Sequence, residues 1–166
     1  MTSMRFSNVT NQSFWDAKYA GRKPRYSLND PLYGKRGLLA RTLLPRLKDS
    51  KDILEIGCGS SRFMLFFNMV AGLDTYGIDF SCEGLQNLQM MSAHHGVRHK
   101  LYFGDMFEHE VEGQKFDVVF HAGLVEHFSD LNLFFRRCRF FAKNDGIMIF
   151  TMPNMQNLAW RWHPRL

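Results

Sequence analysis

The stretch Ile53-Leu54-Glu55-Ile56-Gly57-Cys58-Gly59-Ser60-Ser61 decides the expected fold of this chain. Its first half is a short apolar run, which predicts a buried strand of a parallel sheet. Two glycines end the run, and the serines after them can cap a helix. A strand that turns through glycines into a helix brings backbone N–H groups and the positive end of the helix dipole close to an anionic ligand. The sequence therefore predicts a doubly wound, Rossmann-like α/β sheet with a nucleoside-type ligand at this turn.

The neighbours of the glycines narrow the choice of ligand. A dinucleotide-binding turn has glycine at its sixth position, where this chain has Arg62. Glu55 precedes Gly57 by two residues, and a charged group there is costly in a buried strand unless it has a partner. Asp79 ends the next expected strand, 75–79, where a carboxylate can accept hydrogen bonds from ribose hydroxyls. Arg62 therefore argues against a dinucleotide.

Together these residues resemble the class I S-adenosylmethionine (SAM)-dependent methyltransferases over residues 11–154. The family's first motif, an acid, one residue and Gly-x-Gly-x-Gly, matches residues 55–61, with Ser61 in place of the third glycine. The acid that closes the second strand matches Asp79, and a third motif matches residues 104–106. The fourth motif matches residues 116–128, and the fifth is the strand at 146–150 that leads to residues 153–154.

The resemblance implies that SAM is the cofactor and that ten residues bind it. They are Glu55, Gly57, Cys58, Gly59, Ser61, Asp79, Phe80, Asp105, Met106 and His121. The alternative for His121 is a packed histidine at a strand end. The SAM methyl group is itself electrophilic, so the protein mainly has to align the acceptor. His127, with Glu126 beside it, is the candidate general base for an acceptor that must lose a proton, and the alternative for His127 is a structural role.

Two other kinds of site are not expected. Cys58 has no histidine placed by the sequence to activate it as a nucleophile. His94, His95 and His99 lack metal-ligand spacing, because Gly96 interrupts the helix and no acid or cysteine converges on them.

The segments before the first strand predict helices in residues 11–52. Residues 11–21 form a short capped helix in this prediction, whose Phe14, Trp15 and Tyr19 either fold over the cofactor or pack on the sheet edge. Asp30 is predicted to cap a second helix, with Pro31 at its first position. The apolar stripe predicted for this helix consists of Leu38, Leu39, Thr42, Leu43 and Leu47.

Two further helices are predicted between the later strands. Ser81 caps the first, and its predicted core positions are Leu85, Leu88, Met91 and Met90. Ser129 or Asp130 caps the second, whose predicted core stripe is Leu131, Phe134, Phe135, Cys138 and Phe141. Residues 144–146 are predicted to end this helix, and residues 147–150 to form the fifth strand.

Composition excludes several classes of protein. The net charge of +5 divides unevenly, with eleven basic and four acidic residues in 1–52, four and eleven in 53–131, and six and one in 132–166. Nucleic acid is not expected as a partner, because no aromatic-basic RNA motif accompanies this charge. No uncharged apolar run approaches the roughly 20 residues of a membrane span, and the start lacks a signal-peptide core. Three cysteines without paired spacing predict a cytoplasmic protein.

We expect residues 1–166 to form one domain, with a cofactor-binding core at 53–154 and a short tail at 155–166. The family's sheet usually has seven strands, and about a dozen residues after Asn154 cannot form the last helix and two strands. About five strands are therefore expected, in a fragment, a truncated gene product or a reduced variant. The uncovered fifth strand, with Trp160 and Trp162 in the tail, predicts self-association.

Three functions follow from these observations. The first is a SAM-dependent methyltransferase that acts on a small-molecule acceptor. The second is a non-catalytic SAM-binding or partner-binding remnant of such an enzyme, which the missing strands favour. The third is an NAD-dependent oxidoreductase, against which Arg62 argues.

Overall fold

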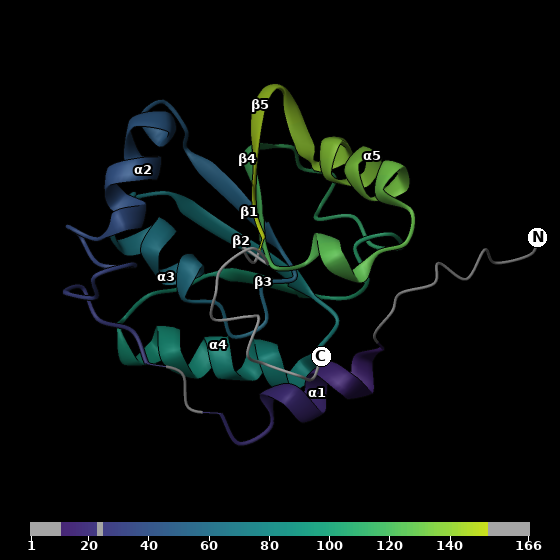
Figure 1. The fold of residues 1–166 in the computed structure, drawn as a ribbon, viewed down its shortest axis with the longest axis horizontal. Coiled ribbons are helices and arrows are strands. Elements are labelled where there is room, and N and C mark those ends of the chain that lie inside the picture. The colour runs from purple at the N-terminus through teal and green to yellow at the C-terminus, as the bar shows by residue number, and fades with distance from the viewer. Residues whose placement is uncertain (1–10, 23–24, 153–166) are drawn as a thin grey trace, which may run out of the picture.

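A five-stranded parallel sheet lies at the centre of the computed structural model, which describes residues 11–22 and 25–152 (Figure 1). The strands, in the spatial order β3-β2-β1-β4-β5, are β1 (Asp52–Ile56), β2 (Asp74–Asp79), β3 (Lys100–Phe103), β4 (Phe116–Ala122) and β5 (Ala142–Thr151). The helices are α1 (Gln12–Tyr19), α2 (Leu38–Leu47), α3 (Arg62–Met69), α4 (Cys82–His94) and α5 (Leu131–Phe141), with a 3₁₀ turn η1 (Val125–His127). The predicted doubly wound α/β fold with five strands is confirmed.

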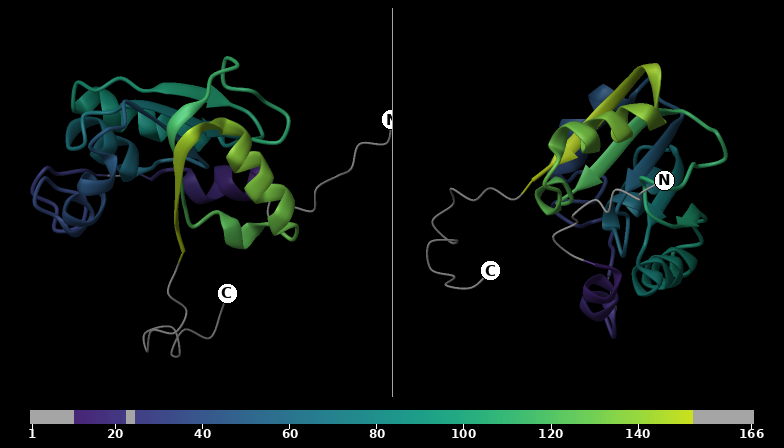
Figure 2. Two further views of the ribbon diagram at one scale, coloured as in Figure 1. Left: turned by 90° about the horizontal axis from the view of Figure 1, so that it is seen from above. Right: turned by 90° about the vertical axis from the view of Figure 1, so that its right-hand side faces the viewer.

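Helices cover both faces of the sheet (Figure 2). Alternate residues of β1 point to opposite faces, so Ile53 packs with α2, α3 and α4 while Leu54 packs with α5. Both side chains are fully buried, as expected for a central parallel strand. The strand order reverses on the two sides of β1, and ligands of open α/β sheets bind at such a reversal, beyond the carboxyl ends of the strands.

The helix predicted to be capped by Asp30 and to start at Pro31 starts seven residues later, at Leu38, so that prediction is wrong. The Asp30 carboxylate accepts hydrogen bonds from the Leu32 and Tyr33 N–H groups at 2.8 and 2.9 Å and closes a turn. Gly34 and Gly37 then bring the backbone so close to residues 28–32 that a Cβ would lie 2.4 and 2.5 Å from carbonyl oxygens. This compact loop displaces the helix start to Leu38.

The predicted core positions of three helices need correction. In α2, Leu43 and Leu47 are buried as expected, but Leu38 and Thr42 are exposed. In α4, Leu85, Leu88 and Met91 are buried while Met90 is exposed. In α5, the buried residues are Phe134, Cys138 and Phe141, whereas Leu131 and Phe135 are exposed.

The end of α5 also differs from the prediction, because β5 starts directly after the helix at Ala142. Residues 144–146 belong to this strand and do not end the helix. The Arg139 guanidinium donates hydrogen bonds to the carbonyl oxygens of Ala142, Lys143 and Asn144, at 2.9 to 3.2 Å. A cationic side chain that satisfies carbonyl groups beyond the helix end favours this early exit.

An ion-pair network joins β1, β4 and β5 at the amino ends of these strands. The Lys143 ammonium lies 2.7 Å from Asp117 Oδ1 and 3.1 Å from Asp52 Oδ2. Asp52 also accepts the Asp117 N–H at 2.7 Å, and Asp117 accepts the Lys51 N–H at 2.8 Å. The hydrogen bond that Lys143 donates to Asp117 raises the pKa of Lys143. Burial alone would raise the pKa of Asp117, but the hydrogen bonds from Lys143 and Lys51 lower it.

We expect Lys143→Met to lower the free energy of unfolding by about 1–2 kcal/mol, because two carboxylates lose a charged donor that water only partly replaces. Urea denaturation measures this change. Lys35→Met, at an exposed loop position, serves as control and should change stability by less than about 0.5 kcal/mol. Equal losses in the two variants would contradict a stabilising role for the network.

Candidate functional site

The turn between β1 and α3 has the backbone conformation that its glycines predict. Gly57 and Gly59 have φ angles of +71° and +34°, which side-chain-bearing residues rarely adopt. The N–H groups of Gly57 and Cys58 both point to the carbonyl oxygen of Ile78, at 2.8 and 3.3 Å. The Ser61 hydroxyl caps α3 by accepting the Phe63 N–H at 3.1 Å. The turn is therefore fastened to the end of β2.

Asp79 is the residue that joins this turn to the next helix. Its Oδ2 accepts the Gly59 N–H at 2.7 Å, and its Oδ1 accepts the Ser81 N–H at 2.7 Å. Burial raises the pKa of Asp79 to about 6, although these two hydrogen bonds favour the carboxylate. Each oxygen keeps a further lone pair. Asp79 can thus hold the two backbone segments and still accept a hydrogen bond from a ligand.

A second buried acid, Glu55, lies on β1 below the turn. It is 1% exposed, and its Oε2 has no hydrogen-bond partner among the described residues. Burial raises its pKa well above the usual range, while a hydrogen bond with the Ser61 side chain opposes this shift. A carboxyl group that stays protonated at neutral pH can donate a hydrogen bond.

A small cavity opens at the carboxyl ends of β1 and β2. Its volume is about 30 Å³, and it is lined by Ile56, Gly57, Ile78, Asp79, Phe80, Gly104, Asp105, Met106, Leu124 and Phe128. Five predicted cofactor residues, Gly57, Asp79, Phe80, Asp105 and Met106, are in this lining. Glu55, Cys58, Gly59, Ser61 and His121 are not. Leu124 and Phe128 also line the cavity, and the sequence did not indicate this, because their only signal is an apolar character in the loop after β4.

Helix α1 lies against the glycine turn through Tyr19. A Cβ on Gly59 would lie 2.4 Å from the Tyr19 hydroxyl oxygen, and one on Gly84 would lie 3.0 Å from the Tyr19 ring. Tyr19 therefore fits between the turn and the first turn of α4 only because both positions are glycine. Burial, followed by the nearby Asp79 charge, raises the pKa of Tyr19 above its usual value.

Three hydrogen bonds join α1 to α4, and the longest of them runs from the Glu83 N–H to Asp16 Oδ1 at 3.5 Å. The Ser81 hydroxyl donates to Asp16 Oδ1 at 2.6 Å, and the Asn87 side-chain amide donates to the Tyr19 carbonyl at 2.9 Å. Since the Ser81 N–H also binds Asp79, a continuous chain of hydrogen bonds runs from Asp16 to the glycine turn. The aromatic N-terminal segment was predicted either to fold over the cofactor or to pack on the sheet edge. In the structure, its Tyr19 lies over the glycine turn.

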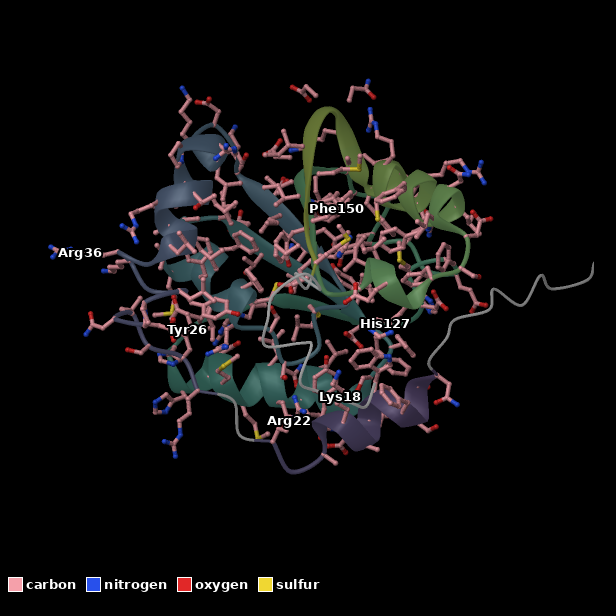
Figure 3. All side chains as sticks on the ribbon, viewed as in Figure 1. Lys18, Arg22, Tyr26, Arg36, His127 and Phe150 are labelled. Carbon is pink, nitrogen blue, oxygen red and sulfur yellow. The ribbon has the colours of Figure 1, made fainter. Side chains whose placement is uncertain are left out.

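The candidate base His127 lies in η1, close to α1 (Figure 3). Its ring meets the Trp15 ring edge-on at 5.0 Å between centroids, and the Lys18 ammonium lies 4.3 Å from the Trp15 ring. Burial lowers the pKa of His127, the Glu126 carboxylate partly offsets this, and Lys18 adds to it. Glu126 is exposed. Neither residue is in the lining of the small cavity, although Leu124 and Phe128 on either side are.

His121 lies in an aromatic cluster on the α5 face of the sheet. Its ring stacks on Phe150 at 4.5 Å and meets Phe134 edge-on at 5.1 Å. It is fully buried, and neither ring nitrogen has a hydrogen-bond partner among the described residues. Burial lowers its pKa to about 4. His121 packs between aromatic rings and is not in the lining of the small cavity. Its role in cofactor binding stays a prediction.

Two other expectations concern reactive or metal-binding groups. Burial raises the pKa of the Cys58 thiol well above its usual range, so Cys58 is a poor nucleophile, as expected. Within residues 11–22 and 25–152, no three histidine, cysteine, aspartate or glutamate side chains gather so that they could hold a metal ion. In the same part of the chain, no helix combines the length and the apolar character of a membrane span.

The fold and the turn together define a class of protein: an open α/β sheet with a glycine turn after β1 and a buried acid at the end of β2, suited to a nucleoside-type ligand. Residues 47–164 match the model of a family described as "Methyltransferase domain". The chain therefore belongs to the methyltransferase-domain family, and its sheet is that of the class I SAM-dependent methyltransferases.

Curated relatives agree with this assignment. The chain is 33% identical over 151 residues to a ubiquinone biosynthesis O-methyltransferase of Azorhizobium caulinodans, covering 85% of this chain and 57% of that protein. It is 24% identical over 121 residues to (S)-coclaurine N-methyltransferase of Papaver somniferum, covering 72% and 34%. The chain thus spans about half the length, or less, of the curated relatives that it matches.

Solved structures share the fold at lower identity. A SAM-dependent methyltransferase of Clostridium acetobutylicum superposes with a TM-score of 0.62 at 19% identity, covering 73% of this chain and 50% of that chain. Protein PH0226 of Pyrococcus horikoshii superposes with a TM-score of 0.64 at 23% identity, covering 74% and 55%.

The placement of His121 predicts a dependence of stability on pH. Its pKa is about 4 in the folded chain and about 6.5 when unfolded, so between these values only the unfolded state binds the proton. Stability is therefore lost as the pH falls from about 6.5 to 4. We expect His121→Leu to remove about 2 kcal/mol of this loss at pH 5, measured by urea denaturation at pH 7 and pH 5.

The control for this experiment is His94→Leu, at an exposed position on α4, which should keep the full loss. Some loss will remain in the His121 variant, because burial also lowers the pKa of His99 to about 4. The same pH dependence in wild type and His121→Leu would contradict the burial of a neutral imidazole at this position.

The hydrogen bond between Asp16 and Ser81 predicts how firmly α1 is held. We expect Asp16→Ala to speed amide hydrogen exchange in α1 about tenfold, because the helix loses a charge-assisted contact to α4. Alanine favours the helix itself, so faster exchange would report undocking from α4. Gln12→Ala, at an exposed position of the same helix, is the control. Unchanged exchange in Asp16→Ala would show that Tyr19 holds the helix without Asp16.

Proposed function

We propose that this chain binds SAM at the β1–α3 turn and that the protein transfers its methyl group to a small-molecule acceptor. The observation that carries the proposal is the position of Asp79, which closes β2 and holds the N–H of Gly59 in the glycine turn. In open α/β sheets this arrangement places a carboxylate beside a sugar and a glycine-rich backbone beside the rest of the ligand.

The chemistry of the surrounding groups fits SAM. Asp79 can accept hydrogen bonds from ribose hydroxyls, and we assign the adenine to Asp105 and Met106, which line the same cavity. Glu55, on β1 just before the turn, can orient the glycine backbone through its hydrogen bond with the Ser61 side chain. His121 acts on the site through packing, since it lies against Phe134 and Phe150.

The small cavity at Asp79 has too little volume to hold the whole cofactor. Its volume of about 30 Å³ is far below the roughly 300 Å³ at which small-molecule sites begin. Side chains border the space that has to open, with Leu124 contacting the position of a Cβ on Gly57 at 3.0 Å and Tyr19 lying over Gly59. We therefore propose that binding displaces Leu124 or Tyr19.

Bound SAM supplies an electrophilic methyl group, so the chain itself has to position the acceptor and, for a hydroxyl acceptor, take its proton. We propose His127 as this base and Glu126 as the group that supports its protonation. Burial lowers the pKa of His127, which leaves its imidazole neutral and able to accept a proton at neutral pH. Trp15, edge-on to His127, offers an apolar wall beside it.

The small-molecule acceptor is supported by the names of the relatives. They include ubiquinone biosynthesis O-methyltransferases and a coclaurine N-methyltransferase, and one solved neighbour is described as bound to N-methylheliamine and S-adenosylhomocysteine (SAH). The alternative of a non-catalytic SAM-binding or partner-binding remnant keeps the same cofactor site. An oxidoreductase is disfavoured, since Arg62 points to Asp30 and Tyr33 where a dinucleotide turn has a glycine.

Self-association through β5 stays a prediction, as does a cytoplasmic location. β5 pairs with β4 and forms one edge of the described sheet, with Met148 39% exposed on it. An apolar strand at a sheet edge invites pairing. The tail residues Trp160 and Trp162, which belong to the same prediction, lie outside the described residues.

Calorimetric titration with SAH, SAM and NAD tests the cofactor. We expect SAH and SAM to bind and NAD not to bind. Asp79→Asn should weaken SAH binding about tenfold or more, because a charge-assisted hydrogen bond is worth about 1.5–3 kcal/mol. Asp74→Asn, at the exposed opposite end of the same strand, should leave the affinity unchanged. Equal affinity in the two variants, or binding of NAD alone, would refute the assignment.

Transfer of a labelled methyl group to a panel of phenols and amines then separates enzyme from remnant. Binding of SAH without transfer would favour the remnant. If transfer occurs, His127→Ala should lower kcat for phenols more than for amines, since only the phenol has to lose its proton to the base in the reacting step.

A further inference from the structure

A second and larger cavity lies on the outer side of α4, away from the glycine turn. Its volume is about 670 Å³, within the range of small-molecule sites. One wall is the chain after α1, at Gly21, Arg22, Arg25 and Tyr26, and the other is α4 from Glu83 to His94. It shares no lining residue with the small cavity at Asp79. We call it the α4 groove.

The middle of the α4 groove is apolar. Met91 is buried there, and Met90 is 62% exposed although it is a large apolar side chain. Tyr26 is 8% exposed and is held in place, since its hydroxyl donates to the Tyr33 carbonyl at 3.0 Å and its ring meets His95 edge-on at 5.5 Å. Methionine side chains adapt to the shape of a ligand, and a fixed aromatic ring offers a flat partner.

The charged groups of the α4 groove are mainly cationic. Arg22 and Arg25 are exposed, and within residues 11–22 and 25–152 neither forms an ion pair with a carboxylate. The one carboxylate in the lining is Glu83, in the first turn of α4. A guanidinium group binds a carboxylate or phosphate through two parallel hydrogen bonds, which makes unpaired arginines suited to an anion.

The length of α4 along the groove limits the length of a ligand that fits there. From Glu83 to His94 the helix rises about 16 Å, at about 1.5 Å per residue. In Figure 3, Arg22 lies beside the half of α4 that faces α1, while Tyr26 lies toward its other end. Arg22 and Arg25 both belong to the wall opposite this helix, so the cations face the apolar side chains of α4 from one side.

We propose that the α4 groove binds a small amphipathic anion, an aromatic or short aliphatic body with one acidic group. The body lies on Met90, Met91 and Tyr26, and the acidic group binds Arg22 and Arg25. This site is separate from the proposed cofactor site, and its occupancy does not depend on methyl transfer.

The test uses 8-anilinonaphthalene-1-sulfonate, an aromatic anion whose fluorescence rises in apolar sites. We expect one saturable site in the wild-type chain, with affinity weakened tenfold or more in Arg22→Gln/Arg25→Gln. The matched control Arg36→Gln/Arg41→Gln removes the same charge from exposed positions outside the groove and should change affinity less than twofold. Arg36 is labelled in Figure 3, away from Arg22 and Tyr26. Uncharged N-phenyl-1-naphthylamine should bind both double variants equally.

Two further measurements locate the probe. In a chain labelled with methyl-¹³C methionine, the signals of Met90 and Met91, assigned by Met90→Leu and Met91→Leu, should shift on titration. Saturating SAH should not displace the probe. Equal weakening in the two arginine pairs, shifts confined to other methionines, or displacement by SAH would overturn the proposal. Failure of SAH to bind at all would overturn the proposed function and leave the α4 groove standing.

Discussion

The hydrogen bonds of the Asp79 carboxylate hold together the segments at the carboxyl ends of β1 and β2, and the rest of the site depends on them. Its two oxygens accept N–H groups from two different segments, Gly59 in the turn after β1 and Ser81 at the start of α4. Ser81 extends this connection to Asp16, and thus to α1. A single buried side chain therefore fixes the relative positions of one strand end, one turn and the start of α4, and α1 is attached through Ser81.

This arrangement concentrates acidic groups in a buried space. Burial raises the pKa of both Asp79 and Glu55, and the proximity of Asp79 contributes to the shift of Glu55. A group with a pKa of about 6 changes its charge close to neutral pH, and such shifts are common where a ligand binds. The hydrogen bonds to Asp79 favour its charged form, so they preserve a carboxylate that the surrounding apolar residues would otherwise neutralise.

Carboxylate groups have different partners at the amino ends and at the carboxyl ends of the strands. At the amino ends of the strands, Lys143 forms ion pairs with Asp52 and Asp117, and this network holds three strand starts together. At the carboxyl ends of the strands, the N–H groups of the glycine turn and of the start of α4 bind the Asp79 carboxylate in place of a cation. Among the residues that the structure describes, no cationic side chain forms an ion pair with Asp79, which suits its proposed role of binding ribose hydroxyls. The cations Arg22 and Arg25 lie instead in the α4 groove, on the segment after α1.

The sequence by itself determined the class of fold and the main turn. A buried strand, Gly57, Gly59 and Asp79 specify local geometry through apolar runs, missing Cβ atoms and a strand-end acid, so these features were predicted correctly. Apolar periodicity also identified the buried faces of α4 and most of α5.

Only the tertiary structure decided which groups meet across the chain. The late start of α2 arises because Gly34 and Gly37 pack on residues 28–32, and a capping pattern cannot show that contact. Tyr19 reaches the glycine turn because Gly59 and Gly84, 25 residues apart, leave room for one ring. The ring of His121, for which the sequence left open a cofactor contact or packing at a strand end, lies against Phe134 and Phe150, because the alternation of β4 turns its side chain toward α5. The α4 groove likewise joins segments about 60 residues apart, and local sequence carries no signal for contacts at such separations.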